Sequence, residues 1–141
     1  MSYLLDTNVV SELRKARTGR CDAGVARWIA GVEPASLFIS AVTLYELERG
    51  VLLTIRRNPE QGSALRRWLT EQVETAFGGR ILPVGAEVAQ RCAMLSVPDP
   101  RPLPDSLIAA TALVHGLTVV TRNVADFAPM GAPLLNPWSA A

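Results

Sequence analysis

Residues 117–121 (LTVVT) form a short β-branched run that is apolar on both faces, as expected for the central strand of a parallel sheet. Three further short apolar runs, at residues 2–5, 37–39 and 81–84, alternate along the chain with stretches of helical periodicity. This alternation indicates a parallel sheet with helices on both sides. We therefore predict an α/β fold that forms a single domain over residues 1–141.

Helix-start and helix-stop residues divide the rest of the chain. Asp6-Thr7-Asn8 offers capping chemistry for a first helix, Pro59 can open a helix directly after another one ends, and Gly116 ends the last helix. The predicted helices cover about residues 9–13, 22–30, 42–57, 59–77, 86–95 and 105–115. The tail at residues 133–136 is predicted to add an edge strand.

The bulk composition limits where such a chain can work. Hydrophobic residues make up 49% of the chain and charged residues 19%, which argues against disorder. No apolar run approaches the roughly 20 residues needed to cross a bilayer, and an acidic residue at position 6 precedes any signal-peptide segment. We expect a cytoplasmic protein that does not enter membranes. Cys21 and Cys92 lack CxxC spacing, so neither a zinc site nor a disulfide framework is expected.

Four acidic residues each lie where a predicted element starts or stops: Asp6, Glu46, Asp105 and Asp126. In parallel α/β sheets, functional groups gather outside the carboxyl ends of the strands, so these side chains are candidates for one cluster. Carboxylates that converge repel one another, and such a group usually implies a hard cation. Oxygen ligands without nitrogen or sulfur favour Mg²⁺ or Mn²⁺ over zinc.

Each acid also has a purely structural interpretation. Asp6 can be an N-cap, Asp105 an ordinary first-turn acid and Asp126 a turn residue. Periodicity places Glu48, and not Glu46, on the apolar stripe of the helix at 42–57. On pattern alone, Glu46 is predicted to be solvated and Glu48 to be buried and paired.

Missing motifs narrow the chemistry further. A single His rules out a two-histidine mechanism of RNA cleavage, and no GxSxG nucleophile motif is present. Neither GxGxxG after the first strand nor GxxxxGK[ST] occurs, so nucleotide-binding glycine loops are absent from the sequence. What remains is a metal ion that activates water against a phosphodiester. We predict a magnesium-dependent phosphodiester-cleaving enzyme that acts on RNA.

Four segments resemble the motifs of one family. Residues 5–13 (LDTNVVSEL) resemble the opening motif of PIN-domain proteins, most closely the toxins of VapBC-type toxin–antitoxin pairs. Residues 40–50, 104–112 and 121–127 are similar to the second, third and fourth motifs, in the family order. In that alignment Glu46 is the site residue and Glu48 is not.

The resemblance implies a three-layer α/β/α domain with a short, mainly parallel central sheet. It also implies an endoribonuclease in which carboxylates hold Mg²⁺ or Mn²⁺ and position the water that attacks phosphorus, leaving a 5′-phosphate. Asp6 and Asp105 are then expected as direct metal ligands. Glu46 and Asp126 are expected to bind the metal directly, through water, or only when substrate is present. Four polar residues are expected to orient these carboxylates: Thr7, Asn8, Thr121 and Asn123.

The same resemblance implies partners. We expect a homodimer and a small antitoxin of the VapB type, whose tail covers the acidic pocket and inserts an Arg among the carboxylates. With a net charge of +1, any RNA-binding track must be local. Candidate RNA contacts are Arg14, Lys15, Arg17, Arg56, Arg57, Arg66 and Arg67.

Two other functions stay open at this point. A haloacid-dehalogenase-like phosphatase also begins with an acid after its first strand, but phosphotransferring members need a second Asp two positions later, where this chain has Asn8. The other alternative is a catalytically weak PIN-fold module that binds nucleic acid. The presence of all four acids argues against that module.

Overall fold

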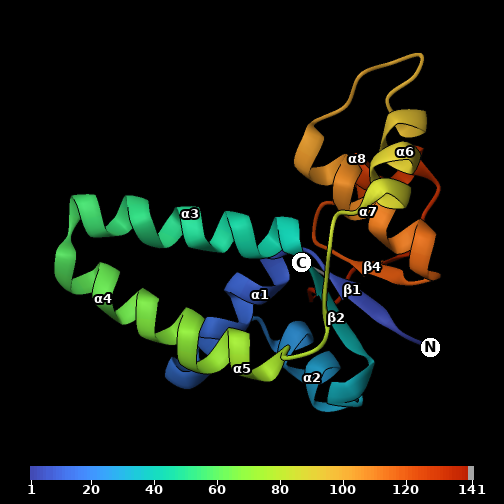
Figure 1. Ribbon diagram of the computed structural model, residues 1–141. Coiled ribbons are helices and arrows are strands. Elements are labelled where there is room, and N and C mark those ends of the chain that lie inside the picture. Colours follow the sequence, from blue (N-terminus) through green and yellow to red (C-terminus); the bar gives the residue numbers. More distant parts are fainter. Residues whose placement is uncertain (140–141) are drawn as a thin grey trace.

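The computed structural model describes residues 1–139 and contains a five-stranded sheet, shown in Figure 1. The strands are β1 (Tyr3–Leu5), β2 (Leu37–Ser40), β3 (Ile81–Leu82), β4 (Thr118–Val120) and β5 (Leu134–Leu135). Their order in the sheet is β3-β2-β1-β4-β5, and every neighbouring pair is parallel. The predicted parallel sheet and its edge strand in the tail are both confirmed.

Helices cover both faces of this sheet. They are α1 (Thr7–Leu13), α2 (Ala23–Ala30), α3 (Ala41–Arg57), α4 (Pro59–Arg67), α5 (Glu74–Ala76), α6 (Ala86–Leu95), α7 (Leu103–His115) and α8 (Val124–Phe127). In Figure 1, α6, α7 and α8 lie on one side of the sheet, and α1, α2 and α5 lie on the other. The three-layer α/β/α architecture is therefore confirmed. Within residues 1–139, none of these helices is long and apolar enough to cross a membrane.

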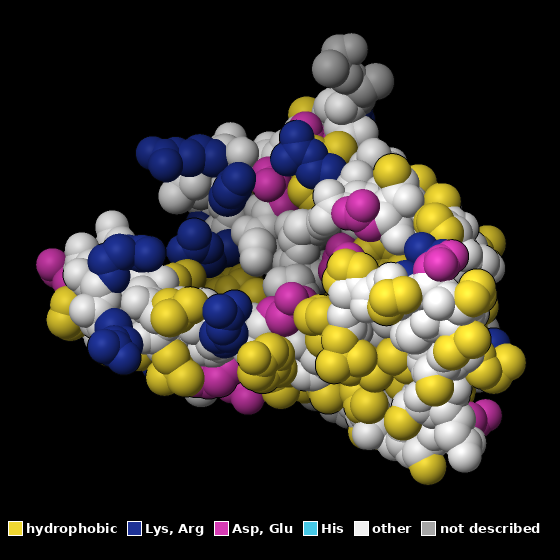
Figure 2. Space-filling view, turned by 90° about the horizontal axis from the view of Figure 1, so that it is seen from above, with side chains coloured by type: hydrophobic (Ala, Val, Ile, Leu, Met, Phe, Trp, Pro, Cys, Tyr) yellow, Lys and Arg dark blue, Asp and Glu magenta, His cyan; other side chains and the backbone are white. Residues whose placement is uncertain are grey.

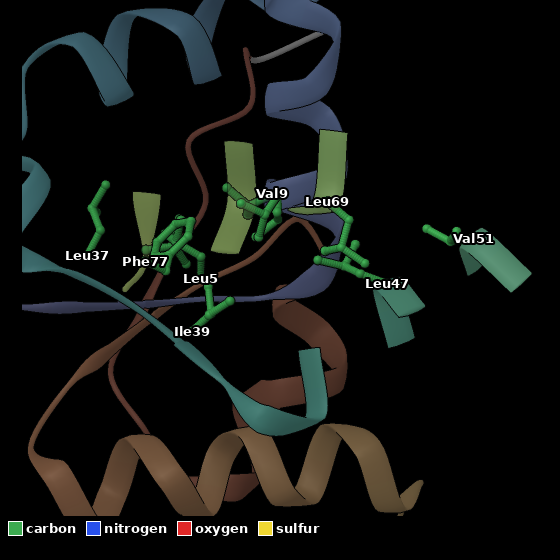
Figure 3. Close-up of a cluster of buried hydrophobic side chains, with 11 residues drawn as sticks. Leu5, Val9, Leu37, Ile39, Leu47, Val51, Leu69 and Phe77 are labelled. Atoms are coloured by element: carbon green, nitrogen blue, oxygen red, sulfur yellow. The ribbon is translucent and has the colours of Figure 1, made fainter. Parts of the chain in front are cut away.

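Successive residues of the central strands enter two separate cores. Leu4 and Val119 pack with α7 and α8, whereas Leu5 and Val120 pack with the helices on the other face. This second core, drawn in Figure 3, joins the sheet to α1, α3 and the segment that ends at Phe77. Because both faces are covered, β1 (YLL) and β4 (TVV) are mainly apolar, and the last two residues of each strand are buried.

Several element boundaries differ from the sequence-based prediction, and four of the differences have a clear physical cause. The helix at 59–77 contains a π-helical stretch, Trp68–Val73, and the strand at 81–84 stops before Pro83 because proline has no N–H for the ladder. Helix α7 begins at Leu103, inside the proline-rich segment, because proline is tolerated in a first helical turn. The four-residue helix α8 was not predicted, since one turn leaves too little periodicity to detect.

Helices α3 and α4 form an antiparallel hairpin, here called the arm, that projects from the sheet (Figure 1). Across the arm, the Arg66 guanidinium donates two hydrogen bonds to the Glu48 carboxylate, at 2.6 and 2.5 Å. Glu48 is thus paired, as its periodicity predicted, but its side chain is 41% exposed and not buried. Arg66 is engaged in this pair, which argues against its predicted contact with RNA.

The close approach of the two arm helices makes a testable prediction about glycine. A Cβ added at Gly62 would lie 2.5 Å from the Cα of Ile55, whereas one added at Gly50 would meet nothing within 4 Å. Gly62→Ala is therefore expected to lower the free energy of unfolding by about 1–3 kcal/mol through overpacking. Gly50→Ala should raise it by about 0.5–1 kcal/mol through helix propensity. Urea unfolding of both variants measures the difference, and equal effects would contradict this helix contact.

Candidate active site

The carboxyl ends of β1 and β4 bring Asp6 and Thr121 side by side. Leu5 is in register with Val120, and the Asp6 N–H donates to the Val120 carbonyl at 2.9 Å. The Thr121 hydroxyl then donates to Asp6 Oδ2 at 2.8 Å, while the Thr7 N–H donates to Oδ1 at 2.8 Å. Asp6 is thus the N-cap of α1, as predicted, and its buried carboxylate is held at both oxygens.

Glu46 reaches the same place from the second turn of α3. Ser40 ends β2 and caps α3, which fixes where that helix starts relative to the sheet edge. The Thr7 hydroxyl donates to Glu46 Oε1 at 2.6 Å, linking the first turn of α1 to α3. Glu46 is therefore not the solvated residue that periodicity indicated, and the assignment made from the motif is consistent with its position.

Asp105 and Asp126 come from the other side of the sheet. Asp105 lies in the first turn of α7, where unsatisfied N–H groups favour a negative charge, and Asp126 lies in α8. Partial burial raises the pKa of Asp105 above its ordinary value, and the negative charges of Asp126 and Glu46 raise it further. Asp126 is exposed, so it borders the cluster at its rim.

A cavity of about 450 Å³ opens at this edge of the sheet. Its lining includes Asp6, Glu46 and Asp105 but not Asp126, so three of the four predicted acids share it directly. In the space-filling view, acidic side chains border a hollow in the middle of the face, and Lys and Arg side chains gather on the side of the arm (Figure 2). Segments separated by about 100 residues in sequence therefore form one polar, acidic pocket.

The pKa of Asp6 reflects its burial first and the neighbouring carboxylates second. Burial raises the pKa of Asp6 from 3.8 to about 6, and the charges of Asp105 and Glu46 add to the increase. The hydrogen bonds from Thr121 and Thr7 oppose it without cancelling it. A bound cation would relieve this repulsion, so the donor set fits a hard metal ion in its chemistry.

The same side chains do not converge on a single coordination centre. Across residues 1–139, no three Asp, Glu, His or Cys side chains lie close enough to hold one ion between them. The carboxylates line one cavity and influence one another's charge. An ion placed there would have at most two of them as direct ligands.

The four residues expected to orient the carboxylates are all at the site, but they act in two ways. Thr7 and Thr121 donate hydrogen bonds directly to Glu46 and Asp6. Asn123 instead donates its backbone N–H to Thr121 Oγ1 at 2.9 Å, and Asn8 Nδ2 lies 3.5 Å from the same oxygen. The two asparagines thus support Thr121 and do not touch the Asp6 carboxylate.

Four residues that line the cavity were not predicted from the sequence: Ser11, Glu12, Arg122 and Trp138. The first two lie three and four residues after Asn8, on the same face of α1, so helical spacing could have found them. Glu12 accepts the Asp22 N–H at 2.8 Å, which lowers its pKa and ties α1 to the start of α2. Trp138 carries no comparable signal, because its place depends on the path of the tail.

Comparison with known proteins identifies the family. The model of the PIN domain family matches residues 3–129, a range that contains all four acids. The chain belongs to the PIN domain family. Within this PIN fold, three of the four motif acids line the cavity at the carboxyl edge of the sheet, and Asp126 lies at its rim.

Several relatives of this PIN domain have been described. VapC ribonuclease Y4jK of Sinorhizobium fredii is 34% identical, over 98% of this chain and 99% of that protein. The crystal structure of FitAcB from Neisseria gonorrhoeae superposes with a TM-score of 0.86 at 32% identity, covering 98% of this chain and 99% of the other. A toxin–antitoxin complex from Klebsiella pneumoniae superposes with a TM-score of 0.69 at 27% identity, covering 99% and 100%.

Proposed function

We propose that this PIN-domain protein is the toxin ribonuclease of a toxin–antitoxin pair and that it hydrolyses RNA with Mg²⁺ or Mn²⁺. One observation carries the proposal: carboxylates from three distant segments line one cavity at the sheet edge, with Asp126 at its rim, and the pKa of Asp6 there is raised to about 6. The names of the similar proteins, a VapC ribonuclease and a toxin–antitoxin complex, support the substrate and the biological role.

The proposed metal ligands follow from burial and position. Asp6 and Asp105, whose pKa values are raised by burial, would bind the ion directly. Glu46 also lines the cavity, but its Oε1 already accepts the Thr7 hydroxyl, so Glu46 and the rim residue Asp126 would act through water. This division suits Mg²⁺, which is often held by one or two carboxylates and keeps several waters. When bound, such an ion activates a water and neutralises charge on the phosphodiester.

The residues of the chain would prepare the site for that chemistry. Thr7 and Thr121 each hold one carboxylate in a fixed orientation, as groups behind a metal site commonly do. Thr7 occupies Oε1 of Glu46, and among residues 1–139 no hydrogen bond is found at its Oε2. We therefore assign to Oε2 of Glu46 the role of accepting a hydrogen bond from the attacking water, which orients that water.

Cleavage of RNA by the purified protein tests this proposal. With Mg²⁺, total RNA should be cut to fragments that carry 5′-phosphates, EDTA should stop the reaction, and Mn²⁺ should restore it. Glu48→Gln is a suitable control, because Glu48 is paired with Arg66 on the arm and does not line the cavity. Cleavage that persists in EDTA would contradict the metal mechanism, and no cleavage under any condition would favour a module that only binds nucleic acid.

We also propose the partners expected from the family: a VapB-type antitoxin and a second copy of this chain. A guanidinium from the antitoxin could pair with two carboxylate oxygens in the acidic cavity and so compete with the metal. Co-expression with a neighbouring small reading frame, followed by measurement of mass in solution, tests both partners. The haloacid-dehalogenase-like alternative does not apply, since the chain belongs to the PIN family and has Asn8 where a second Asp would be needed.

A further inference from the structure

The cavity that gathers the carboxylates also contains a guanidinium in a defined position. Arg122 directly follows Thr121, and its side chain lines the cavity together with Asp6 and Asp105. Its Cζ lies 5.5 Å from the centroid of the Trp138 ring, within range of a cation–π contact. Because an aromatic face restrains a guanidinium without neutralising it, the charge of Arg122 stays available to a ligand.

Arg122 differs in this respect from Lys15, the other cation that lines the cavity. The Lys15 ammonium lies 3.1 Å from Glu12 Oε1 and is therefore paired. In the described part of the chain, the ion pairs join Lys15 to Glu12 and Arg66 to Glu48, and Arg122 takes part in neither. Its guanidinium thus lines an acidic pocket without forming an ion pair with any of the acids there.

The position of Trp138 is fixed by the docking of the tail onto α2. Asp22 Oδ2 accepts the Ser139 N–H at 2.9 Å, and Ser139 Oγ accepts the Gly24 N–H at 2.8 Å. Gly24 leaves room for this contact, because a Cβ there would lie 2.5 Å from the Pro137 carbonyl oxygen. The tail therefore holds the indole at the cavity wall by specific bonds.

We propose that Arg122 binds a phosphate of the RNA backbone next to the bond that is cut, with Trp138 and the docked tail as positioning elements. This inference rests on the proposed ribonuclease function. A phosphodiester that enters the cavity meets four carboxylates, one of which, Glu12, is paired with Lys15, so it needs a nearby cation to offset their repulsion. A guanidinium suits that task, since it can donate two parallel hydrogen bonds to one phosphate.

The first test measures binding of a short, mixed-sequence, single-stranded RNA by fluorescence anisotropy in EDTA. Arg122→Gln is expected to weaken binding about tenfold. It should also flatten the dependence of log K on log salt by about 0.7, the value for one phosphate contact on a single strand. Arg27→Gln is the matched control, because Arg27 is exposed on α2, does not line the cavity and removes the same charge. Its binding and salt slope should stay close to those of the wild type.

A second test concerns the positioning role of the tail. Gly24→Ala should displace the tail and weaken RNA binding about threefold, in keeping with loss of one cation–π contact. In the Arg122→Gln background, the same change should have no further effect on RNA binding, because the group that the tail positions is already gone. A merely structural effect of Gly24→Ala would instead persist in both backgrounds.

The outcomes separate this inference from the ribonuclease proposal. Equal affinity and equal salt slope for Arg122→Gln and Arg27→Gln would overturn the phosphate contact. If the wild type fails to cleave RNA with Mg²⁺ while Arg122→Gln still loses binding, the nuclease proposal fails and the phosphate contact stands. If the wild type cleaves RNA while Arg122→Gln binds RNA as tightly as the wild type, the phosphate contact fails and the nuclease proposal stands.

Discussion

Asp6→Asn is expected to reduce RNA cleavage by more than about 100-fold while leaving the protein folded, because loss of even a group behind a metal ligand costs about 10–100-fold. Asp6 is buried in the lining of the acidic cavity, and its two oxygens are held by hydrogen bonds from Thr7 and Thr121. An amide has nearly the same shape but cannot supply the negative charge that a direct metal ligand needs. Cleavage rates with saturating Mg²⁺, together with circular dichroism of both proteins, measure the effect.

Two further variants show whether the loss of cleavage comes from the Asp6 carboxylate itself. Thr121→Val should cost less than Asp6→Asn, since it removes the hydrogen bond to Asp6 Oδ2 and keeps the carboxylate. Glu48→Gln should cleave RNA like the wild type, because Glu48 lies on the arm outside the cavity. Undiminished cleavage by a folded Asp6→Asn protein would exclude Asp6 as a metal ligand.

The second large effect is a change in how stability depends on pH. Folding raises the pKa of the Asp6 carboxyl from 3.8 to about 6, mainly through burial. Because the folded protein favours the protonated form of this carboxyl, the group stabilises the fold fully below the unfolded pKa. This stabilisation is lost as the pH rises through the folded pKa. The relevant window is therefore about pH 4 to 6, and the loss amounts to roughly 3 kcal/mol in metal-free buffer.

Asp6→Asn should abolish that loss. The stability of the variant relative to the wild type is expected to increase as the pH rises through this window and to level off above it. The substitution also alters the hydrogen bond from Thr121, which changes the free energy of unfolding of the variant by the same amount at every pH. The pH dependence of the difference between variant and wild type is therefore unaffected. Urea unfolding in EDTA at a series of pH values measures it.

A carboxyl on the arm provides the control for this measurement. The hydrogen bonds from Arg66 lower the pKa of Glu48, so its contribution is present at neutral pH and is lost as the pH falls. Glu48→Gln should therefore change the pH dependence in the opposite direction to Asp6→Asn. Parallel stability curves for the wild type and Asp6→Asn would mean that the fold does not penalise the charged form of Asp6.

The position of Glu46 shows what periodicity could and could not predict. The apolar stripe of α3 correctly predicted that Glu48 is paired, since that helix face meets α4 in the arm. Glu46 points away from the stripe, which usually means solvent, but here that direction leads to the sheet edge and to the Thr7 hydroxyl. Periodicity reports which face is apolar, and only the neighbouring segments determine what a polar face meets.

Asp6 and Thr121 were predictable for a simple reason. Each follows a short apolar strand, and neighbouring parallel strands place their exits at the same edge of a sheet. Arg122 and Trp138 were not, because their contact joins the loop after β4 to a tail that returns over α2. No local pattern encodes such a return, which depends on hydrogen bonds to Asp22 and on the missing side chain at Gly24.

Direct binding of Mn²⁺, followed by water-proton relaxation, tests most directly whether these carboxylates hold a divalent ion. The wild type is expected to bind Mn²⁺ saturably, with Mg²⁺ as a competitor. Asp6→Asn and Asp105→Asn should each weaken that binding at least about tenfold, whereas Glu48→Gln should not change it. Equal Mn²⁺ binding by all four proteins, or none by the wild type, would contradict a metal site at the carboxyl edge of the sheet.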